Sequence, residues 1–237
     1  KSQFGGSLKA FISGGGALDK EVGVFLNSIG LPTLQGYGLT ETSPVVSCNP
    51  IHDIRIQTVG PPFTGNQVKI ADDGEILIKG ENVMLGYWNN KEETDKVLKD
   101  EWLYTGDIGH FDNRYLKITD RKKDIIITLG GDNISPVKIE NDLTKINFIE
   151  QSLVYGDSKP YLVALLVLNK EFKKTSNDEI DNEIETINKN LSKIEKIKKF
   201  IIIEDQFTIE NGLMTPTLKL KRYKIINKYK NQLEKLY

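Results

Sequence analysis

The chain has 237 residues, of which 38% are hydrophobic and 27% are charged, and its formal net charge is −1. This composition is typical of a globular protein with one or two packed domains, and it excludes wholesale disorder. The near-zero net charge gives no reason to expect a nucleic-acid partner.

The cysteine content and the apolar runs bear on location. A single cysteine, Cys48, excludes an internal disulfide and fits a reducing compartment, so we expect a cytoplasmic protein. The longest apolar run, from Tyr161 to Leu168, is too short to span a bilayer, and no signal pattern precedes it. The first residue is Lys1 rather than a methionine, which leads us to expect a piece of a longer protein.

The first 35 residues follow the strand, turn, helix, strand order of an α/β unit. A strand is expected from Leu8 to Ser13, a helix from Asp19 to Ile29 with Asp19 as its N-cap, and a second strand from Thr33. The apolar face of that helix comprises Val22, Phe25, Leu26 and Ile29. The turn of Gly14, Gly15 and Gly16 either offers backbone N–H groups to a phosphate or nucleotide or is simply tight. It lacks the Lys-Ser/Thr ending of an NTPase phosphate loop.

A second glycine turn, residues 36–42 (GYGLTET), places an aromatic ring between two glycines. Such a turn can expose the Tyr37 ring for stacking and direct the hydroxyl of Thr40 and the carboxylate of Glu41 towards phosphate oxygens and a cation. The alternative is a turn in which Thr40 and Glu41 cap a helix.

Residues 59–120 have the pattern of short strands joined by tight turns, which predicts a small twisted β-subdomain or barrel. Residues 67–70 and 75–79 flank an Asp-Asp-Gly turn and predict a hairpin, and a short helix is expected over 91–98. Asp107, between Gly106 and Gly109, is expected in a turn, where its carboxylate either holds a pair of ribose-like hydroxyls or closes an Asx-turn.

A charge cluster at residues 120–124 (DRKKD) marks the expected joint between two unequal domains, residues 1–120 and 121–237. After it, Ile125 to Thr128 predicts a short buried strand, and Gly130 and Gly131 form a turn that lets backbone approach a ligand. Ser135 and Pro136 then begin a helix as N-cap and first-turn proline.

The second part alternates predicted helices and strands, as expected of a small α+β domain with about three of each. Helices are predicted at residues 136–146, within 170–199 and at 219–237, and strands at 149–155, 161–168 and 199–204. Before the last helix, a Gly- and Pro-containing loop delivers Lys219, which either reaches an anionic centre or belongs to a solvated basic face with Lys221 and Arg222.

Five of these motifs, in the same order, resemble those of the adenylate-forming (ANL) superfamily of acyl-CoA synthetases, luciferases and peptide-synthetase adenylation domains. The five motifs are residues 13–18, 36–42, 104–107, 120–124 and 215–219. Residues 31–47, 81–88 and 211–222 look most like the long-chain fatty acyl-CoA synthetases. The resemblance covers nearly the whole chain. It implies the C-terminal part of a large AMP-binding α/β domain, followed by a small α+β lid domain.

The resemblance also implies residue roles in an acid–thiol ligase that uses ATP, Mg²⁺, a fatty acid and coenzyme A. The fatty carboxylate attacks the α-phosphate to give an acyl-adenylate, and the thiol of coenzyme A then displaces AMP. The implied nucleotide-binding residues are Gly15, Gly16, Ala17, Tyr37 and Gly38 around the adenine, and Asp107 and Arg121 at the ribose. The implied catalytic and moving parts are Thr40 at the α-phosphate, Glu41 at Mg²⁺, Lys219 as the adenylation lysine, Lys123 as the hinge, and Gly130 and Gly131 beside the pantetheine.

Two features depart from the family pattern. Leu218 stands where many relatives have glycine, and no Ser/Thr/Gly-rich phosphate loop ending in Lys-Gly occurs in the chain. Long-chain members of the family often share the Leu218 variation, so we discount it. Because the phosphate loop is missing, we expect little activity from these residues alone and a need for an N-terminal half in cis or in trans. The alternatives are a non-catalytic remnant that binds a nucleotide or a protein, and an adenylation domain that loads a carrier protein. Acyl chain length, oligomeric state and a peripheral membrane contact of the basic last helix stay open.

Overall fold

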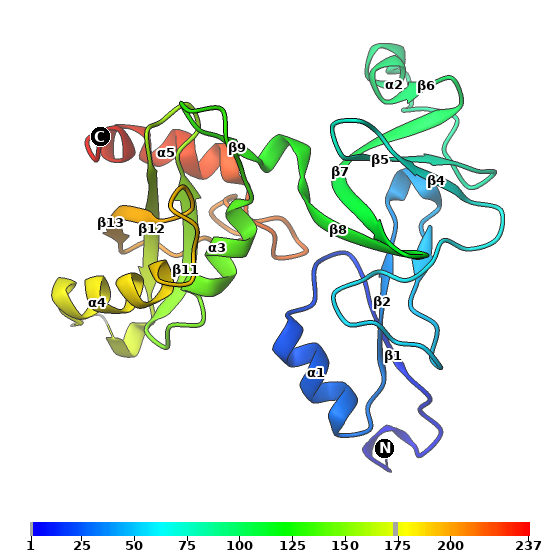
Figure 1. The fold of residues 1–237 in the computed structure, drawn as a ribbon, viewed down its shortest axis with the longest axis horizontal. Helices are drawn as coiled ribbons and strands as arrows, with labels where there is room; N and C mark the ends of the chain where they lie inside the picture. Colours follow the sequence, from blue (N-terminus) through cyan, green and yellow to red (C-terminus); the bar gives the residue numbers. More distant parts are fainter. Residues whose placement is uncertain (1, 173–174) are drawn as a thin grey trace. The chain divides into compact units, whose positions relative to one another are not determined.

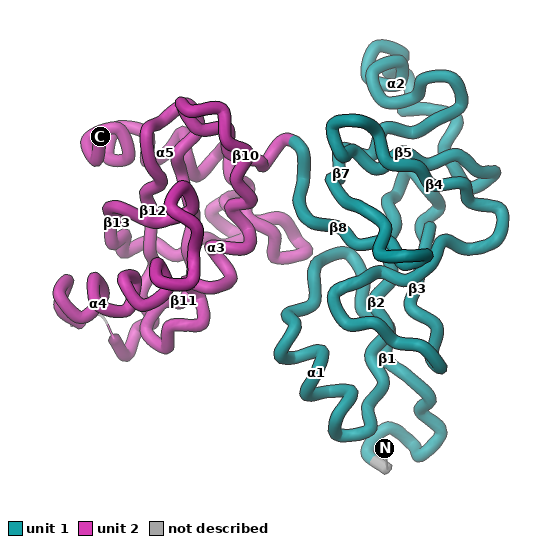
Figure 2. The backbone as a smooth tube through the Cα atoms, viewed as in Figure 1, with its two compact units in different colours: residues 1–122 teal, residues 123–237 magenta. Residues whose placement is uncertain are grey.

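The computed structural model describes residues 2–172 and 175–237, which form two compact units, residues 1–122 and 123–237 (Figure 2). The division falls between Lys122 and Lys123, within the charge cluster, while the sequence placed it between residues 120 and 121. None of the helices in the described ranges combines the length and the apolar run that crossing a bilayer requires.

The first unit begins with a small sheet of order β1-β2-β3 (Figure 1). Its elements are β1 (Phe11–Ser13), α1 (Lys20–Ser28), β2 (Thr33–Tyr37) and β3 (Ser47–Cys48), and a short 3₁₀ turn, η2 (Thr40–Thr42), follows β2. Strand β1 pairs in parallel with β2, as a strand-helix-strand unit requires. The Asp19 carboxylate accepts hydrogen bonds from the N–H groups of Glu21 and Val22, which confirms the predicted N-cap. The apolar face of α1 lies open, and Phe25 is 59% exposed.

The second sheet of this unit runs in the order β4-β5-β7-β6, with β8 paired to β7. Its elements are β4 (Gln67–Ile70), β5 (Glu75–Lys79), α2 (Lys91–Val97), β6 (Leu98–Lys99), β7 (Trp102–Asp112) and β8 (Tyr115–Arg121). The predicted hairpin is confirmed as β4 and β5.

Asp107 was expected in a turn, and that expectation is wrong, because it lies within β7. The strand bulges near it, as Glu75 pairs with Ile108 while Leu77 pairs with Tyr104. Gly106 absorbs the bulge in the left-handed region, at φ +70°. The two glycines that indicated a turn thus mark irregular positions in a continuous strand.

The two sheets of the first unit share one core. Tyr37 of the small sheet and Val46, which precedes β3, pack with Ile76, Ile78 and Leu116 of the larger sheet. The linking segment is bonded to β8, since the N–H of Val59 donates to Leu116 O at 2.8 Å and the N–H of Leu116 donates to Gly60 O at 3.0 Å. The end of β2 is therefore fixed against β7 and β8.

The second unit is a three-stranded sheet of order β11-β12-β13 with helices on both faces (Figure 1). Its elements are β9 (Ile126–Ile127), β10 (Asn133–Ile134), α3 (Pro136–Leu143), β11 (Ile149–Tyr155), β12 (Leu162–Leu168), α4 (Asn177–Asn188), β13 (Ile197–Ile203) and α5 (Arg222–Glu234). Successive β12 side chains alternate between two cores, one with α3 and α4 and one with α5. Every residue of β12 is buried, as its unbroken apolar run requires.

Several expected boundaries in this unit are wrong, including the end of α3, which lies at Leu143 rather than residue 146. The predicted strand 125–128 shortens to Ile126–Ile127, a pair in the hairpin with β10. Helix α4 ends at Asn188, because that side chain bonds both the N–H and the C=O of Ile197, each at 2.9 Å, and so turns the chain back. Helix α5 begins at Arg222, so Lys219 precedes it in a loop.

Candidate functional site

The glycine turns of the first unit both follow strands that run in the same direction. Ser13 at the end of β1 pairs with Gln35 in β2, so the loops that begin at Gly14 and Gly38 leave the same edge of the parallel pair. The carboxyl edge of parallel strands is where α/β proteins bind ligands. A Cβ atom added to Gly15 or Gly16 would meet no atom within 4 Å, so this loop leaves open space on its ligand side.

Three of the predicted nucleotide-binding residues come together beside this edge. The hydroxyl of Tyr37 donates to Asp107 Oδ2 at 2.6 Å, and Arg121 Nε lies 2.8 Å from Asp107 Oδ1. Asp107 faces Arg121 across the β7–β8 ladder, while Tyr37 reaches it from β2, 70 residues earlier. The result is a buried carboxylate held between a hydroxyl and a half-exposed guanidinium.

The Tyr37 ring is not displayed on a turn as expected. It is the last residue of β2, is 7% exposed and packs in the core of the first unit. Burial, and then the charge of the Asp107 carboxylate, raises the pKa of Tyr37 well above its ordinary value. Tyr37 is therefore a permanent hydrogen-bond donor to Asp107 at neutral pH.

Gly38 and Thr42 shape the turn that follows. A Cβ atom on Gly38 would lie 1.7 Å from the carbonyl oxygen of Pro44, so no other residue fits there. The turn is capped by Thr42, whose hydroxyl accepts from the N–H of Leu39 at 2.9 Å and donates to Leu39 O at 3.0 Å. The alternative in which Thr40 and Glu41 cap a helix is therefore wrong, and the exposed Thr40 side chain lies at the open edge.

Glu41 is oriented by a residue that the sequence reasoning did not single out. Tyr87 donates its hydroxyl to Glu41 Oε1 at 2.9 Å, and burial, followed by this bond, raises the pKa of Tyr87. The N–H of Met84 also bonds Glu41 O at 2.8 Å, which ties residues 84–87 to the turn. Tyr87 belongs to residues 81–88, one of the segments that resemble the long-chain synthetases. This resemblance was the sequence feature that could have indicated Tyr87.

Glu41 fits a magnesium ion of the kind that a nucleotide brings with it. The described residues contain no group of three or more His, Cys, Asp or Glu side chains able to hold a metal alone. Mg²⁺ commonly takes one or two protein carboxylates, with substrate phosphates and water completing its shell. With Tyr87 on Oε1, the second oxygen of Glu41 suits that arrangement.

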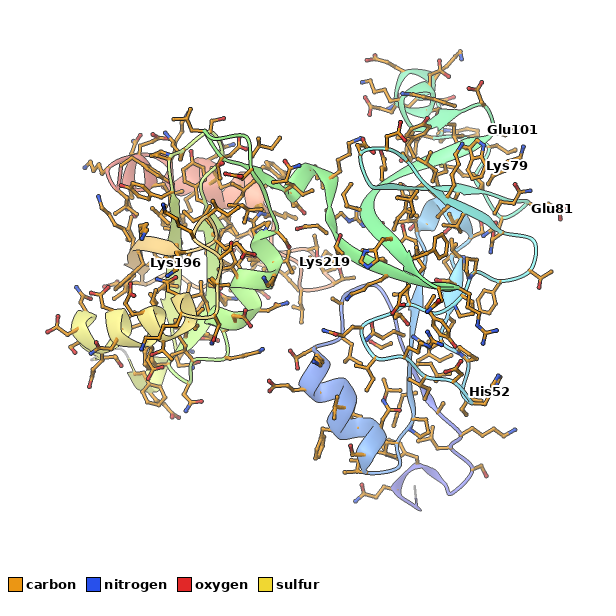
Figure 3. All side chains as sticks on the ribbon, viewed as in Figure 1. His52, Lys79, Glu81, Glu101, Lys196 and Lys219 are labelled. Atoms are coloured by element: carbon orange, nitrogen blue, oxygen red, sulfur yellow. The ribbon has the colours of Figure 1, made fainter. Side chains whose placement is uncertain are left out.

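The remaining predicted residues lie in or next to the second unit. Lys219 is exposed in a loop closed by the Met214–Leu220 bridge (Figure 3), where its N–H donates to Thr215 Oγ1 at 3.0 Å. The preceding Leu218 adopts φ +59°, a left-handed conformation that favours glycine. Gly130 and Gly131 form the tip of the β9–β10 hairpin, and Lys123 is exposed in the short turn η3 (Lys122–Asp124).

Glu75, a buried carboxylate that no sequence motif indicated, supports the strand that carries Asp107. Its Oε1 accepts the N–H of Gly106 at 2.8 Å, and its Oε2 lies 2.8 Å from Lys122 Nζ. Lys122 also bonds Asp73 at 2.6 Å, and these bonds raise its pKa. Glu75 thus fixes both the bulge beside Asp107 and the residue next to Lys123.

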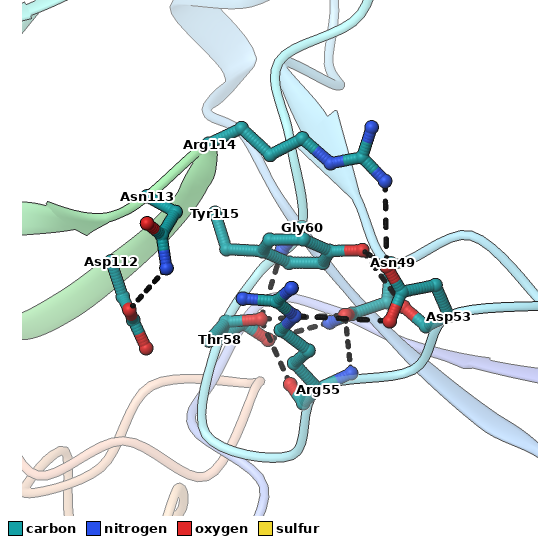
Figure 4. Close-up of polar contacts among 9 residues, drawn as sticks. All are labelled: Asn49, Asp53, Arg55, Thr58, Gly60, Asp112, Asn113, Arg114 and Tyr115. Atoms are coloured by element: carbon teal, nitrogen blue, oxygen red, sulfur yellow. Dashed lines mark hydrogen bonds and ion pairs between the residues drawn. The ribbon is translucent and has the colours of Figure 1, made fainter.

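A second polar cluster anchors the opposite end of β8 (Figure 4). Tyr115 donates to Asp53 Oδ2 at 2.6 Å, which, as the largest cause, lowers the pKa of Asp53. The Arg55 guanidinium lies 4.0 Å from the Tyr115 ring centroid. Because Arg121 ends the strand that Tyr115 begins, this cluster holds the strand that presents Arg121.

The first unit is an α/β domain with a buried carboxylate and an arginine beside its strand ends. It is joined to a separate α+β unit that carries an exposed lysine. Residues 1–88 match the family model of the AMP-binding enzyme, and residues 123–237 match that of the AMP-binding enzyme C-terminal domain. The chain belongs to the AMP-binding enzyme family.

Several proteins to which the chain is similar are named as ligases or synthetases. The chain is 38% identical over 259 residues to the long-chain-fatty-acid–CoA ligase FadD15 of Mycobacterium bovis, covering 100% of this chain and 43% of that protein. It is 35% identical to the long-chain-fatty-acid–[acyl-carrier-protein] ligase AEE15 of Arabidopsis thaliana, covering 98% and 36%. O-succinylbenzoate coenzyme A synthetase from Bacillus subtilis, in complex with ATP and magnesium ion, superposes with a TM-score of 0.76 at 28% identity, covering 90% and 45%. The chain therefore spans less than half the length of these proteins.

Proposed function

We propose that this chain supplies the ribose-binding, magnesium-binding and lysine-bearing part of an ATP-dependent long-chain fatty acid–CoA ligase. The observation that carries the proposal is the Tyr37–Asp107–Arg121 cluster at the carboxyl edge of the β1–β2 pair. The family match and the ligases among its relatives support the same reaction class.

The first unit binds the nucleotide in this proposal. Gly15, Gly16, Ala17 and Gly38 offer backbone at the open edge, and the adenine lies against the turn that Tyr37 begins. Asp107 accepts the ribose hydroxyls, because a carboxylate oxygen can accept a second hydrogen bond beside the one that it already holds. Arg121 holds this carboxylate in place through the ion pair at 2.8 Å, and Thr40 donates to the α-phosphate.

Lys219 provides the charge for the first step. When a fatty carboxylate oxygen attacks the α-phosphorus and pyrophosphate leaves, negative charge grows on the phosphoryl oxygens. An ammonium group placed there lowers the barrier. The second unit turns about Lys123 between the steps, so Lys219 withdraws and the Gly130–Gly131 turn comes to the pantetheine chain. The thiol sulfur of coenzyme A then attacks the acyl carbonyl carbon, and AMP leaves.

Magnesium fits this scheme as the partner of Glu41 and the phosphates. When bound, it neutralises phosphate charge and holds the triphosphate in one conformation. The contribution of the chain is to keep Glu41 in place through Tyr87 and the Met84 backbone bond.

An N-terminal half, in cis or as a separate chain, is the proposed protein partner. The exposed apolar side chains on β1 and α1 include Ile12 of the strand and Val22, Phe25 and Ile29 on the apolar face of the helix. Exposed apolar surface of this kind is typical of an interface. The matched ligases are more than twice as long as this chain, and the additional body would provide the triphosphate cradle and the acyl pocket.

Binding and turnover test the proposal separately. Calorimetry should detect AMP binding to the chain, and Asp107→Ala should abolish it. Pyrophosphate release with palmitate and ATP should be negligible for these 237 residues and appear when an N-terminal half is supplied. In that active form Lys219→Ala should slow pyrophosphate release by about 100-fold or more, while Lys221→Ala, its basic neighbour, should retain most activity. A chain that binds no AMP would refute the enzyme proposal and favour a non-catalytic remnant that binds a protein.

A second acceptor is favoured by one comparison. The Arabidopsis relative is named for an acyl carrier protein rather than for coenzyme A. Offering both thiols to preformed acyl-adenylate decides between them, and transfer only to the carrier protein would replace coenzyme A in the scheme.

A further inference from the structure

A buried ion pair lies at the start of α5, directly after the Lys219 loop in the chain. Arg222, the first residue of α5, donates from Nη1 to Glu140 Oε1 at 2.5 Å and from Nη2 to the carbonyl oxygen of Val154 at 2.6 Å. Both charged side chains are 11% exposed. Buried pairs of this kind contribute little net stability, but removing one partner leaves an uncompensated charge in the interior.

Glu140 connects three elements of the second unit. It lies on α3, and its Oε1 also accepts the N–H of Val154 in β11 at 2.7 Å, while its backbone carbonyl accepts from Ser152 Oγ at 3.1 Å. Arg222 adds α5 to this junction. Helix α3 follows the hairpin that carries Gly130 and Gly131, and α5 follows the loop that carries Lys219.

The Lys219 loop is held at its ends rather than along its length. Its N-terminal end continues from the buried Leu213, whose carbonyl accepts the N–H of Lys221 at 2.8 Å. Residues 216–219 are exposed, and the bonds within the loop run among Thr215, Thr217, Leu218 and Lys219. The direction of Lys219 therefore depends on where the first turn of α5 sits, and Arg222 is the side chain that fixes that turn to β11 and α3.

We propose that Glu140 and Arg222 are positioning residues that hold the Lys219 loop and the Gly130–Gly131 hairpin on one rigid frame. The role of the loop rests on the function proposed above. The frame explains why an ion pair, rather than apolar packing, is found here, since a guanidinium that donates from two nitrogens to two separate acceptors fixes direction as well as distance.

Amide hydrogen exchange tests the frame without any activity. In Arg222→Met and Glu140→Gln, the amides of Thr215 and Lys221 should exchange at least about tenfold faster, while those of β12 keep their rates. Arg222→Lys should fall between, because it retains the charge but not the fork. Lys224→Gln, on the same helix, is the control and should change neither set. Equal acceleration in the loop and in β12 would mean general destabilisation and would overturn the proposal.

Kinetics of the form completed with an N-terminal half complete the test. Arg222→Lys, assayed well below its melting temperature, should lower kcat for pyrophosphate release with little change in KM for ATP. A changed KM with unchanged kcat would overturn the positioning role. If Lys219→Ala keeps full activity while the exchange result holds, the proposed function fails and the frame stands. If Lys219→Ala is inactive and loop exchange is unchanged, the frame alone fails.

Discussion

The two units differ in how completely each covers its own sheet. In the second unit, helices bury both faces of β12, and every residue of that strand is inaccessible. In the first, β1 is an edge strand whose Ile12 is 75% exposed, and Val22 and Phe25 of α1 are exposed as well. The second unit thus has a complete core of its own, whereas the first carries its buried Tyr37–Asp107–Arg121 cluster beside an uncovered apolar surface. In the proposed ligase, the lid that carries Lys219 needs to be a rigid body, while the nucleotide platform can share its core with a neighbouring domain.

The largest expected effect comes from matched aliphatic truncations in the two units. Leu165→Ala, in the fully buried β12, should lower the free energy of unfolding of the second unit by about 3 kcal/mol. Ile12→Ala, in β1, should cost less than about 0.5 kcal/mol, because that side chain is already in water.

The two tryptophans, Trp88 and Trp102, both lie in the first unit, so their fluorescence follows it while β12 amide exchange follows the second. Leu165→Ala should speed the exchange of the β12 amides and leave the midpoint of the fluorescence-detected unfolding transition unchanged. An equally large cost for Ile12→Ala would show that the exposed face is a core after all.

Asp107→Asn is the next largest change and tests the buried cluster of the platform. The amide keeps the shape but removes the charge that Arg121 faces, and charge-assisted bonds contribute about 1.5–3 kcal/mol. We expect the free energy of unfolding of the first unit, measured by tryptophan fluorescence, to fall by that amount. The affinity for AMP should fall with it. Asp112→Asn, at the exposed end of the same strand, is the control. An unchanged transition would place the cluster outside the folding core.

How far the sequence predicted these features depends on the distance over which they act. The Asp19 cap and the β4–β5 hairpin rest on residues two to five apart, and local rules located both. Asp107 was misplaced because two glycines mark a bulge as readily as a turn, and only pairing with β5 distinguishes them. The Tyr87–Glu41 bond joins residues 46 apart and the Arg222–Glu140 bond residues 82 apart. No local pattern encodes such partners, so the sequence indicated the functional side chains but not what holds them.

A stabilising change should be available in the complete core. The hydroxyl of Tyr229, packed between α5 and the sheet, has no hydrogen-bond partner among the described residues. Tyr229→Phe removes the desolvation penalty of that oxygen, so we expect a gain of about 1 kcal/mol in the second unit and none in the first. The β12 exchange rates provide the measurement, and Tyr155→Phe, which loses a bond to Glu234, is the contrasting variant. A loss of stability in Tyr229→Phe would mean that the hydroxyl is hydrated in solution.

The smallest expected effect is an alkaline one, confined to the rim of the second unit. Partial burial, and then the bond to Glu234, raises the pKa of Tyr155 from 10.0 to about 12. The unfolded chain ionises first, so the contribution of Tyr155 is complete below pH 10 and is lost as the pH rises through 12. The stability of the second unit, measured by β12 amide exchange or circular dichroism between pH 9 and 12, should therefore decline less steeply with pH in Tyr155→Phe than in the parent. The exposed Tyr223→Phe should follow the parent.

Because Glu234 also bonds Lys159 at 2.6 Å, Lys159→Met should steepen the decline by leaving the carboxylate to face the phenolate without a cation. Parallel curves for all four proteins would assign the alkaline transition to another tyrosine whose pKa burial raises, Tyr237 in the same unit or Tyr37 in the first.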